Sequence, residues 1–376
     1  MRKGIAALTL AAIVMAVSGC QGKAESGTQK DGQPVSGEQG SMDQSGSQEQ
    51  SNTDGEILKQ AGERGSKENG DSLEKVTVIL DYVANTNHTG MYVAKELGWY
   101  AEAGLDVEII EPTEGATATL VSVGKGDFGI SYQEDVTIAL ASKDPLPVKA
   151  IATVLPHNTS GFAVYEEKEI QSPKDFEGKT YAGWGGPGEE AVLKAVMAKE
   201  GADFSKLNMV ISDGSGFAAL KDQADIMWFF EGWDCIKCKL AGFPIRYMEL
   251  RQLDERLDYY TPVIITSNQV ISEKPDMVRS FLAATEKGYR YAAENPEESA
   301  EILNQYAPDY SMDMLKMSQE YLSGKYVEDN EDWGIMKDSV WDNYTEFLKE
   351  YGVIDKTIPA SQCYTNEFLP GSADCQ

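Results

Sequence analysis

Residues 75–110 read KVTVILDYVANTNHTGMYVAKELGWYAEAGLDVEII, and this stretch decides the fold class. The apolar run at 75–80 predicts a buried strand, and residues 90–100 predict a helix. Residues 106–110 predict a second strand. A strand, a helix and a second strand in this order indicate a βαβ unit with parallel strands.

The same alternation runs along the rest of the chain. Further strands are predicted at 127–131, 148–154, 161–165, 179–183, 209–212, 224–229, 246–250 and 262–266. Further helices are predicted at 116–124, 189–199, 276–294, 296–305, 312–322 and 333–350. We therefore expect an α/β fold of two lobes, each built on a mostly parallel sheet, with a ligand cleft between the lobes.

The N-terminus has the layout of a secretory signal. Arg2 and Lys3 precede an apolar stretch at 5–17, and small residues precede Cys20. This pattern resembles a bacterial lipobox, in which Cys20 becomes the first mature residue and carries the lipid. An ordinary signal peptide with a chance cysteine is the alternative. We expect residues 1–20 to be a lipoprotein signal peptide that places the chain on the outer side of the cell membrane.

A long polar segment follows the cysteine. Residues 21–74 are rich in Gly, Ser, Gln, Asp and Glu and contain no aromatic residue. Such a segment cannot bury enough apolar surface to offset its chain entropy. We expect a disordered acidic tether that lets the folded part range above the membrane.

The charge and the cysteines limit the partners. The formal charge is −28, and it argues against nucleic acid or anionic lipid head groups, because both need basic patches. Beyond Cys20, the cysteines are Cys235, Cys238, Cys363 and Cys375, which could be surface thiols or form local disulfides. The first two could also bind a metal, but a structural zinc site needs four nitrogen or sulfur ligands. We predict no metal and no cofactor.

Polar and aromatic side chains follow the predicted strands. They occur at 81–90, 132–135, 157–161, 184–190 and 228–233. Aromatic faces stack on flat rings, and amides and carboxylates hydrogen-bond the edges of such rings. The Asn and Asp residues could also be simple turn formers, and the last of these runs could be partly core. This composition favours a cleft that binds a flat, polar heterocycle.

Two of these runs have a more specific interpretation. Glu231 lies among aromatic residues, where a carboxylate is costly to bury unless a cationic or amidine-like ligand pairs with it. Residues 184–188 resemble a loop that cradles an anion at the start of a helix. Glu189 and Glu190 follow directly, and they disfavour a strongly anionic group there.

The chain offers no complete catalytic motif. His88 and His157 could act as acids or bases, but a simple hydrogen-bonding role is commoner for histidine. The sequence contains no nucleophile elbow, no Walker loop and no histidine–carboxylate cluster with metal-binding spacing. These observations favour a binding protein over an enzyme.

Several motifs resemble one family of binding proteins. Residues 78–110, 126–134, 157–161, 183–185 and 260–263 are similar to the thiamine-pyrimidine/sulfonate-binding proteins of ABC importers, above all to the branch that binds formylaminopyrimidine or hydroxymethylpyrimidine. The resemblance extends over residues 75–370. It implies a type II periplasmic-binding-protein fold, whose two lobes close on the ligand by hinge bending. Lobe one would be residues 75–167 plus 262–376, and lobe two residues 168–261.

The same superfamily includes a fungal enzyme that makes the thiamine pyrimidine and carries a cysteine-rich, iron-linked run. Residues 257–261 stand at the corresponding place and contain no cysteine, which speaks against an enzyme. Other relatives bind riboflavin, sulfonates or nitrate. The carboxylates at Glu189, Glu190 and Glu231 fit an aminopyrimidine better than a sulfonate.

Strand-end position and the resemblance together predict the ligand site. Stacking is assigned to Trp184, Trp228 and either Trp233 or Tyr132. Edge hydrogen bonds are assigned to Asn85, Asn87, His88, Asn158 and Ser160, the amino-pyrimidine face to Glu189 or Glu231, and the rest of the site to Gln133, Glu134 and Gly185. We expect a monomer that passes its ligand to an ABC permease and ATPase. The alternatives are a riboflavin- or sulfonate-binding protein and a pyrimidine-forming enzyme that uses His88.

Overall fold

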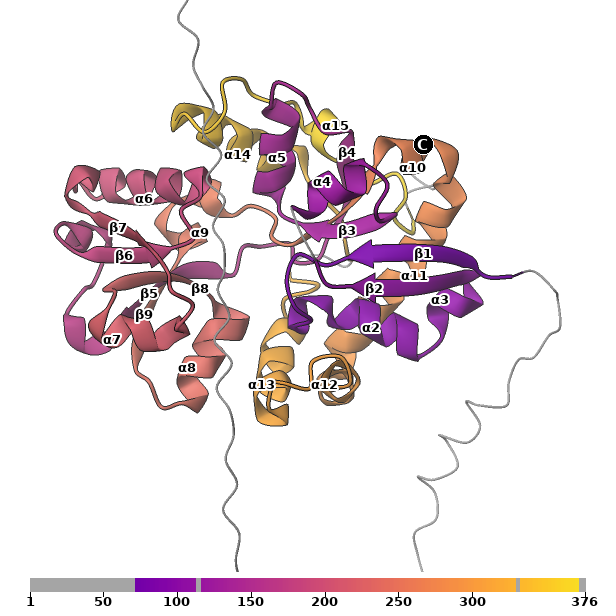
Figure 1. The fold of residues 1–376 in the computed structure, drawn as a ribbon, viewed down its shortest axis with the longest axis horizontal. Coiled ribbons are helices and arrows are strands. Elements are labelled where there is room, and N and C mark those ends of the chain that lie inside the picture. The colour runs from indigo at the N-terminus through magenta and orange to yellow at the C-terminus, as the bar shows by residue number, and fades with distance from the viewer. Residues whose placement is uncertain (1–71, 113–115, 329–331, 372–376) are drawn as a thin grey trace, which may run out of the picture. The chain divides into compact units, whose positions relative to one another are not determined.

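The computed structural model describes residues 72–112, 116–328 and 332–371 (Figure 1). The predicted signal peptide with Cys20, nearly all of the tether, and Cys375 lie outside these residues. No helix in the described ranges is long and apolar enough to cross a membrane.

Two five-stranded sheets organise the described residues. The first has the order β2-β1-β3-β10-β4, with β1 Glu74–Ile79, β2 Leu105–Ile110, β3 Phe128–Ser131, β4 Val148–Thr153 and β10 Val263–Ser267. The second has the order β7-β6-β8-β5-β9, with β5 Ser160–Tyr165, β6 Thr180–Gly183, β7 Asn208–Ile211, β8 Ile226–Phe230 and β9 Ile245–Glu249. Each strand lies within about two residues of its predicted bounds, because its apolar run is bounded by turn-forming residues.

Helices cover both sheets. They are α2 Thr89–Glu96, α3 Trp99–Glu102, α4 Thr117–Ser122, α5 Gln133–Ala141, α6 Pro187–Lys199, α7 Ala219–Asp222, α8 Ile236–Leu240, α9 Leu250–Leu253, α10 Asn268–Glu273, α11 Pro275–Glu294, α12 Pro296–Asn304, α13 Met312–Ser323, α14 Asp338–Glu350 and α15 Ala360–Cys363. The predicted helix at 90–100 is split because Gly98 adopts a left-handed conformation with φ of 77°. The predicted helix at 333–350 begins only at Asp338.

Each sheet contains one strand that runs against its neighbours, so the prediction of mostly parallel sheets is wrong at these positions. Strand β10 is antiparallel to β3 and β4, and β5 is antiparallel to β8 and β9. The chain crosses between the sheets directly before each of them, at 154–159 and at 254–262 (Figure 1). A strand that arrives from the other sheet starts at the edge where its neighbours end, and it must therefore run the opposite way.

The lobe assignment also differs from the prediction in two elements. Strand β5 belongs to the second sheet, although residues 75–167 were assigned to lobe one. Helix α14, from the segment 262–376, buries Tyr344 and Phe347 in the hydrophobic core of the second sheet. Long-range packing decides to which lobe β5 and α14 belong. The local alternation of strands and helices carries no information about this packing.

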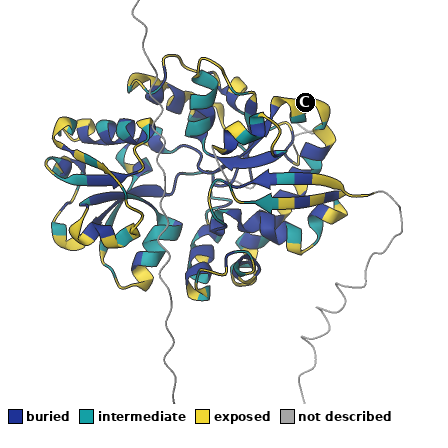
Figure 2. Ribbon diagram, in the orientation of Figure 1, coloured by how far each residue is buried: buried dark blue, intermediate teal, exposed yellow. Residues whose placement is uncertain are grey.

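Close packing of two helices fixes the first site loop. Helix α2 lies against α11, and a Cβ at Gly90 would overlap the ring of Tyr289. The hydroxyl of Tyr289 donates a hydrogen bond of 2.7 Å to the carbonyl of Asn87, just before α2. Figure 2 shows most of α2 in the dark blue of buried residues. Gly90 thus allows the approach that anchors the loop preceding α2.

The three described cysteines are free thiols. Cys238 and Cys363 are buried in hydrophobic clusters, and Cys235 is half-buried. Burial raises the pKa of Cys238 to about 12 and that of Cys363 to about 12, so both thiols are protonated and unreactive at neutral pH. The expectation of surface thiols or a local disulfide is therefore wrong for these two residues.

Candidate functional site

A cavity of about 310 Å³ lies between the elements of the two sheets. The first lobe contributes Asp81, Tyr82, Asn85, Thr86, Asn87, Tyr132 and Leu322 to its wall, and the second lobe contributes Thr159, Trp184, Trp228, Phe230, Gly232, Trp233, Asp234 and Lys237. Most of these residues directly follow the carboxyl ends of β1, β3, β6 and β8, which is where open α/β sheets place their ligands. The strand-end argument therefore located the cavity.

The loop after β1 is folded by its own side chains. Asn85 Oδ1 accepts a hydrogen bond of 2.9 Å from the backbone N–H of Asn87, and Asn85 Nδ2 donates one of 2.9 Å to Val83 O. The backbone N–H of Asn85 donates 3.2 Å to His88 Nδ1, which closes a capping box. The amide of Asn85 thus shapes the loop while its residue lines the cavity, and Asn87 lies beside it on the wall.

His88 is completely buried and does not line the cavity. Its Nδ1 accepts from Asn85 N–H, so its proton is on Nε2, which donates 2.8 Å to Asp81 Oδ1. The other Asp81 oxygen accepts 2.5 Å from the hydroxyl of Tyr132. His88 therefore orients the carboxylate of Asp81, which lies on the cavity wall, while His88 itself does not reach the cavity.

Asp81 stays ionised in this setting. Burial acts to raise the pKa of Asp81, but the hydrogen bonds from His88 and Tyr132 outweigh it and hold the pKa below its ordinary value. Burial and the charge of Asp81 raise the pKa of Tyr132 well above its usual range, so the phenol keeps its proton. The cavity floor therefore presents a fixed negative charge.

Aromatic rings form the opposite wall. Trp184 and Trp228 make an edge-to-face contact, with ring centroids 5.2 Å apart. Trp184 is 55 % exposed, so part of its indole is open to the surroundings. The indole Nε1 of Trp228 is buried and has no hydrogen-bond partner among the described residues. A ligand acceptor would satisfy this N–H.

Trp233 and a carboxylate complete that wall. The ammonium group of Lys237 lies 4.7 Å from the ring centroid of Trp233 and 3.7 Å from Asp234 Oδ1. Asp234 also accepts 3.1 Å from the backbone N–H of Phe230. Burial raises the pKa of Asp234 above its ordinary value, although that N–H and Lys237 oppose the rise. Asp234 and Lys237 were not predicted as site residues, although both continue the 228–233 run.

Other predicted site residues lie behind the wall. Gln133 is fully buried; its Oε1 accepts 2.8 Å from the Tyr260 N–H, and its Nε2 donates 3.1 Å to Val340 O. Glu134 accepts 2.6 Å from the hydroxyl of Tyr344. Both residues follow the wall residue Tyr132, but as the first turn of α5 they face protein instead of cavity. A ligand contact for them remains a prediction.

The loop after β6 is held by Glu189. This carboxylate is buried and accepts hydrogen bonds from Gly185 N at 2.7 Å and Trp184 N at 3.2 Å, and from the hydroxyl of Tyr181. Gly185 has φ of 78°, which favours glycine. Neither Glu189 nor Gly185 is on the cavity wall. Their observed role is to hold the backbone that carries Trp184.

Glu231 also has a protein partner in place of the predicted ligand. Its carboxylate accepts 2.7 Å from the hydroxyl of Tyr321 in α13. Glu231 is half-buried, and a tyrosine from the first lobe supplies its hydrogen bond.

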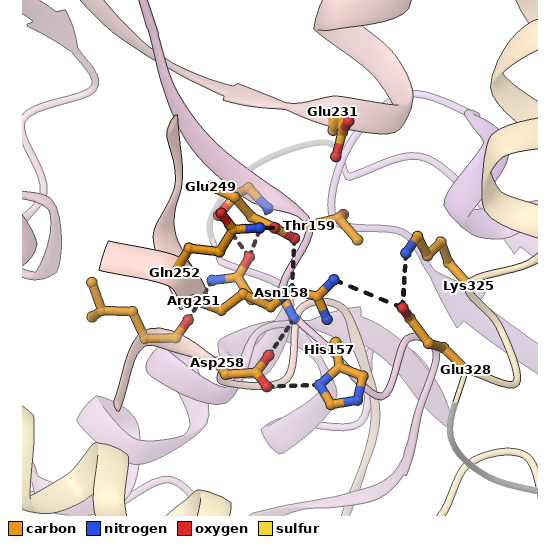
Figure 3. Close-up of polar contacts among 12 residues, drawn as sticks. His157, Asn158, Thr159, Glu231, Glu249, Arg251, Gln252, Asp258, Lys325 and Glu328 are labelled. Carbon is orange, nitrogen blue, oxygen red and sulfur yellow. Dashed lines mark hydrogen bonds and ion pairs between the residues drawn. The ribbon is translucent and has the colours of Figure 1, made fainter. Parts of the chain in front are cut away.

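Asn158 lies in the first crossing segment, and Ser160 is the first residue of β5 directly after it. Asn158 N–H donates 2.9 Å to Asp258 Oδ1, and Asn158 Nδ2 donates 2.8 Å to Leu257 O (Figure 3). His157 Nδ1 and Asp258 Oδ2 are 2.6 Å apart. The Asn158 side chain also accepts from Ser160 N–H at 2.8 Å. These bonds tie the two crossings together, and the residue between Asn158 and Ser160, Thr159, is the one on the wall.

Sequence comparisons find relatives that match most of the chain. The chain is 28 % identical over 305 residues to the formylaminopyrimidine-binding protein of Halalkalibacterium halodurans, covering 79 % of this chain and 91 % of the relative. It is 28 % identical over 308 residues to a 4-amino-5-hydroxymethyl-2-methylpyrimidine phosphate synthase of Legionella pneumophila, covering 79 % and 92 %. It is 22 % identical over 314 residues to the riboflavin-binding protein RibY of Chloroflexus aurantiacus, covering 80 % and 88 %.

Solved structures share the fold. The periplasmic nitrate-binding protein NrtA from Synechocystis superposes with a TM-score of 0.64 at 15 % identity, covering 81 % of this chain and 89 % of that one. The alkanesulfonate-binding protein SsuA from Xanthomonas axonopodis, bound to MOPS, superposes with a TM-score of 0.60 at 13 % identity, covering 77 % and 98 %. The chain therefore has the two-lobed fold of periplasmic solute-binding proteins. The model of one sequence family matches residues 85–299, more than half of the chain, and the protein belongs to this NMT1/THI5-like family.

Proposed function

We propose that the protein is the extracytoplasmic solute-binding lipoprotein of an ABC importer and that its cleft binds a thiamine-type aminopyrimidine. The main support for this proposal is a cavity whose wall combines Trp184, Trp228 and Trp233 with the carboxylates of Asp81 and Asp234. A flat ring stacks on indole faces, and its exocyclic amino group donates to a carboxylate. The formylaminopyrimidine-binding relative supports the same ligand class.

The charge of the wall separates this ligand from a sulfonate. Two carboxylates and one ammonium group, that of Lys237, line the cavity. A sulfonate would meet Asp81 and Asp234 without enough positive charge to offset its desolvation. An aminopyrimidine is neutral or protonated, and it gains hydrogen bonds from the same groups. A riboflavin-type ligand could stack on the same aromatic wall and donate hydrogen bonds from its ribityl hydroxyls, so titration has to separate it from an aminopyrimidine.

The enzyme alternative lacks support at the residue assigned to it. His88 is fully buried, and both of its ring nitrogens are hydrogen-bonded within the protein. A catalytic residue must reach the substrate. Some relatives are named as pyrimidine phosphate synthases, so an enzymatic function should be tested. Turnover of a pyridoxal-type substrate by the parent protein, and its loss in His88→Ala, would establish that function.

Calorimetric titration tests the ligand assignment. The purified protein is titrated with hydroxymethylpyrimidine, its formylamino analogue, riboflavin and taurine. We expect saturable heat with at least one of the two pyrimidines and weaker or no heat with taurine. Trp228→Phe removes the unpartnered N–H but keeps an aromatic ring, and it should weaken pyrimidine binding. Absence of heat with both pyrimidines would refute the proposal.

The membrane anchor is tested separately. We propose that Cys20 carries the lipid, on the basis of the signal pattern that precedes it. Mass spectrometry of protein from membranes should find the mature chain starting at a diacylated Cys20. The variant Cys20→Ser should be released from the membrane fraction. A mature N-terminus at any other residue would contradict the anchor.

A further inference from the structure

Helix α13 connects the two walls of the cleft through one buried hydroxyl. Ser318 is fully buried, and its Oγ donates to the carbonyl of Gly232 in the second lobe. Its Oγ also lies 2.6 Å from Thr86 Oγ1 in the first lobe. Since the Ser318 proton is used on Gly232, Thr86 is the donor to Ser318. Both Thr86 and Gly232 line the cavity.

The helix that carries Ser318 belongs to the first lobe. Leu315 and Leu322 of α13 are buried in the hydrophobic core of the first sheet. The hydroxyl of Tyr326, just beyond the helix, donates 2.7 Å to the carbonyl of Thr86. Thr86 is therefore held from both its side chain and its backbone by residues of this segment. The contact with Gly232 is the one that reaches the other lobe.

Neighbouring residues on the same face of α13 make further contacts with the second lobe. Tyr321 and Leu322 follow Ser318 by three and four positions, so the three side chains share one helix face. The Tyr321 hydroxyl donates 2.7 Å to Glu231. A Cβ at Gly232 would lie 2.8 Å from Tyr321 Cδ1, so glycine is required for this approach.

The second-lobe partner segment is itself unusual. Residues Glu231–Cys235 form a π-helical turn that carries Gly232, Trp233 and Asp234 into the cavity wall. Such turns recur at functional sites, because they rotate side chains out of the regular helical position. Ion pairs of Glu328 form a further contact. Arg251 Nη2 is 3.8 Å from Glu328 Oε1, and the ammonium group of Lys325 also pairs with Glu328 (Figure 3). These groups are partly exposed, and so their ion pairs contribute little.

We infer that Ser318 is a positioning residue for ligand capture. Ser318 holds the Thr86 loop and the Gly232 turn together when the lobes are closed. This inference rests on the proposed function for the identity of the ligand. The Ser318 hydrogen bond to Gly232 exists only while both walls are in place, so its loss should favour the open state. Removing the hydroxyl should therefore speed ligand release and change ligand association much less.

The test compares Ser318→Ala with Ser323→Ala in the full chain. Ser323 lies on the same helix, and its hydroxyl donates to Glu320 O within that helix. The probe is 4-amino-5-hydroxymethyl-2-methylpyrimidine, and release is followed by stopped-flow tryptophan fluorescence. Leaving Gly232 O and Thr86 Oγ1 without the buried partner should raise the dissociation rate about tenfold. The control should keep the parent rate. An unchanged dissociation rate in a folded Ser318→Ala protein would overturn the inference.

Two further variants keep the inference testable if Ser318→Ala fails to fold. Gly232→Ala places a methyl group against Tyr321, and Tyr321→Phe removes only the hydroxyl that binds Glu231. Both should speed release of the probe. If both release it at the parent rate, the inference fails.

Hydrogen exchange separates this inference from the ligand proposal. If the parent protein binds no pyrimidine, the proposed function fails, but Ser318 can still be judged without ligand. Loss of its hydroxyl should then raise amide exchange in residues 83–90 and 226–236 together. A rise in only one of these segments, or in neither, would show that Ser318 does not join the two walls.

Discussion

The carboxylate of Glu134 lies directly against Gly188, where any larger residue would overlap it. Glu134 is in the first turn of α5, after a strand of the first sheet, and Gly188 is in the first turn of α6, after a strand of the second. The contact therefore brings a buried carboxyl group to a junction of the two lobes.

This junction predicts a pH-dependent stability. Burial, with the nearby charges of Asp135 and Glu189, raises the pKa of Glu134 to about 7, while the hydrogen bond from Tyr344 opposes the rise. Tyr259, which stacks on Tyr344, also feels the Glu134 charge. Because the folded pKa is raised, the native state binds the proton more tightly than the unfolded chain does. The resulting stability is fully present below the ordinary pKa and is lost as pH rises through about 7.

Urea unfolding of the unliganded protein between pH 5 and pH 8 measures this effect. The free energy of unfolding should fall over this range by roughly 2–4 kcal/mol. The variant Glu134→Gln should flatten the dependence, while Glu190→Gln, on the partly exposed face of α6, should keep it. A parent-like slope in Glu134→Gln would contradict the assignment.

Replacement of Glu189 should weaken ligand binding without contact between Glu189 and the ligand. In Glu189→Ala, the N–H groups of Trp184 and Gly185 lose their acceptor, and the loop loses its fixed position. We expect about tenfold weaker pyrimidine binding by calorimetry. Glu190→Ala is the matched control, since Glu190 pairs with Lys194 on the outer face of the same helix. Equal affinities in both variants would refute this role.

Asp234 should discriminate aminopyrimidines from other flat rings. In Asp234→Asn, one acceptor oxygen becomes a donor, which opposes the amino group of the ligand. The affinity for hydroxymethylpyrimidine should fall by about ten- to a hundredfold, a cost of roughly 1.4–2.8 kcal/mol. Asp222→Asn, in α7 away from the cavity, should bind as the parent does. Unchanged affinity in Asp234→Asn would remove Asp234 from the site.

The glycine contact between α2 and α11 should be essential for stability. In Gly90→Ala, the added methyl group overlaps the Tyr289 ring, and overpacking of this kind costs about 1–3 kcal/mol or more. Gly324→Ala is the matched control, because its Cβ would meet nothing within 4 Å. Urea midpoints measure the difference. A Gly90→Ala protein as stable as the control would show that α2 can move away without cost.

The sequence predicted the strands and the location of the cavity because both depend on local pattern. Apolar runs between turn formers define β1 and β8, and the polar groups that follow them meet at the cavity. It was harder to predict whether each side chain points into the cavity or into the protein interior. Thr159 lines the cavity, while its neighbours Asn158 and Ser160 bond to each other and to the second crossing. An extended segment alternates its side chains, so an error of one residue exchanges wall for interior.

Partners that are distant in sequence were also beyond prediction. Glu231 was expected to need a charged ligand, but Tyr321, 90 positions later, supplies the hydrogen bond. Asp81 could be recognised as a strand-end carboxylate, but its ionised state depends on the tautomer of His88, which Asn85 sets. These relationships follow from tertiary packing.

The bonds between the two crossing segments determine how the lobes can move. Asp258 holds both His157 and the backbone of Asn158, so the two connections cannot slide past each other. Two connections joined in this way should act as a single hinge, which allows the lobes to rotate but resists sliding of one lobe along the other. The open and closed forms of this protein should therefore differ by one rotation about this hinge. The residues of the two walls would then meet the ligand in the same relative positions at every closure.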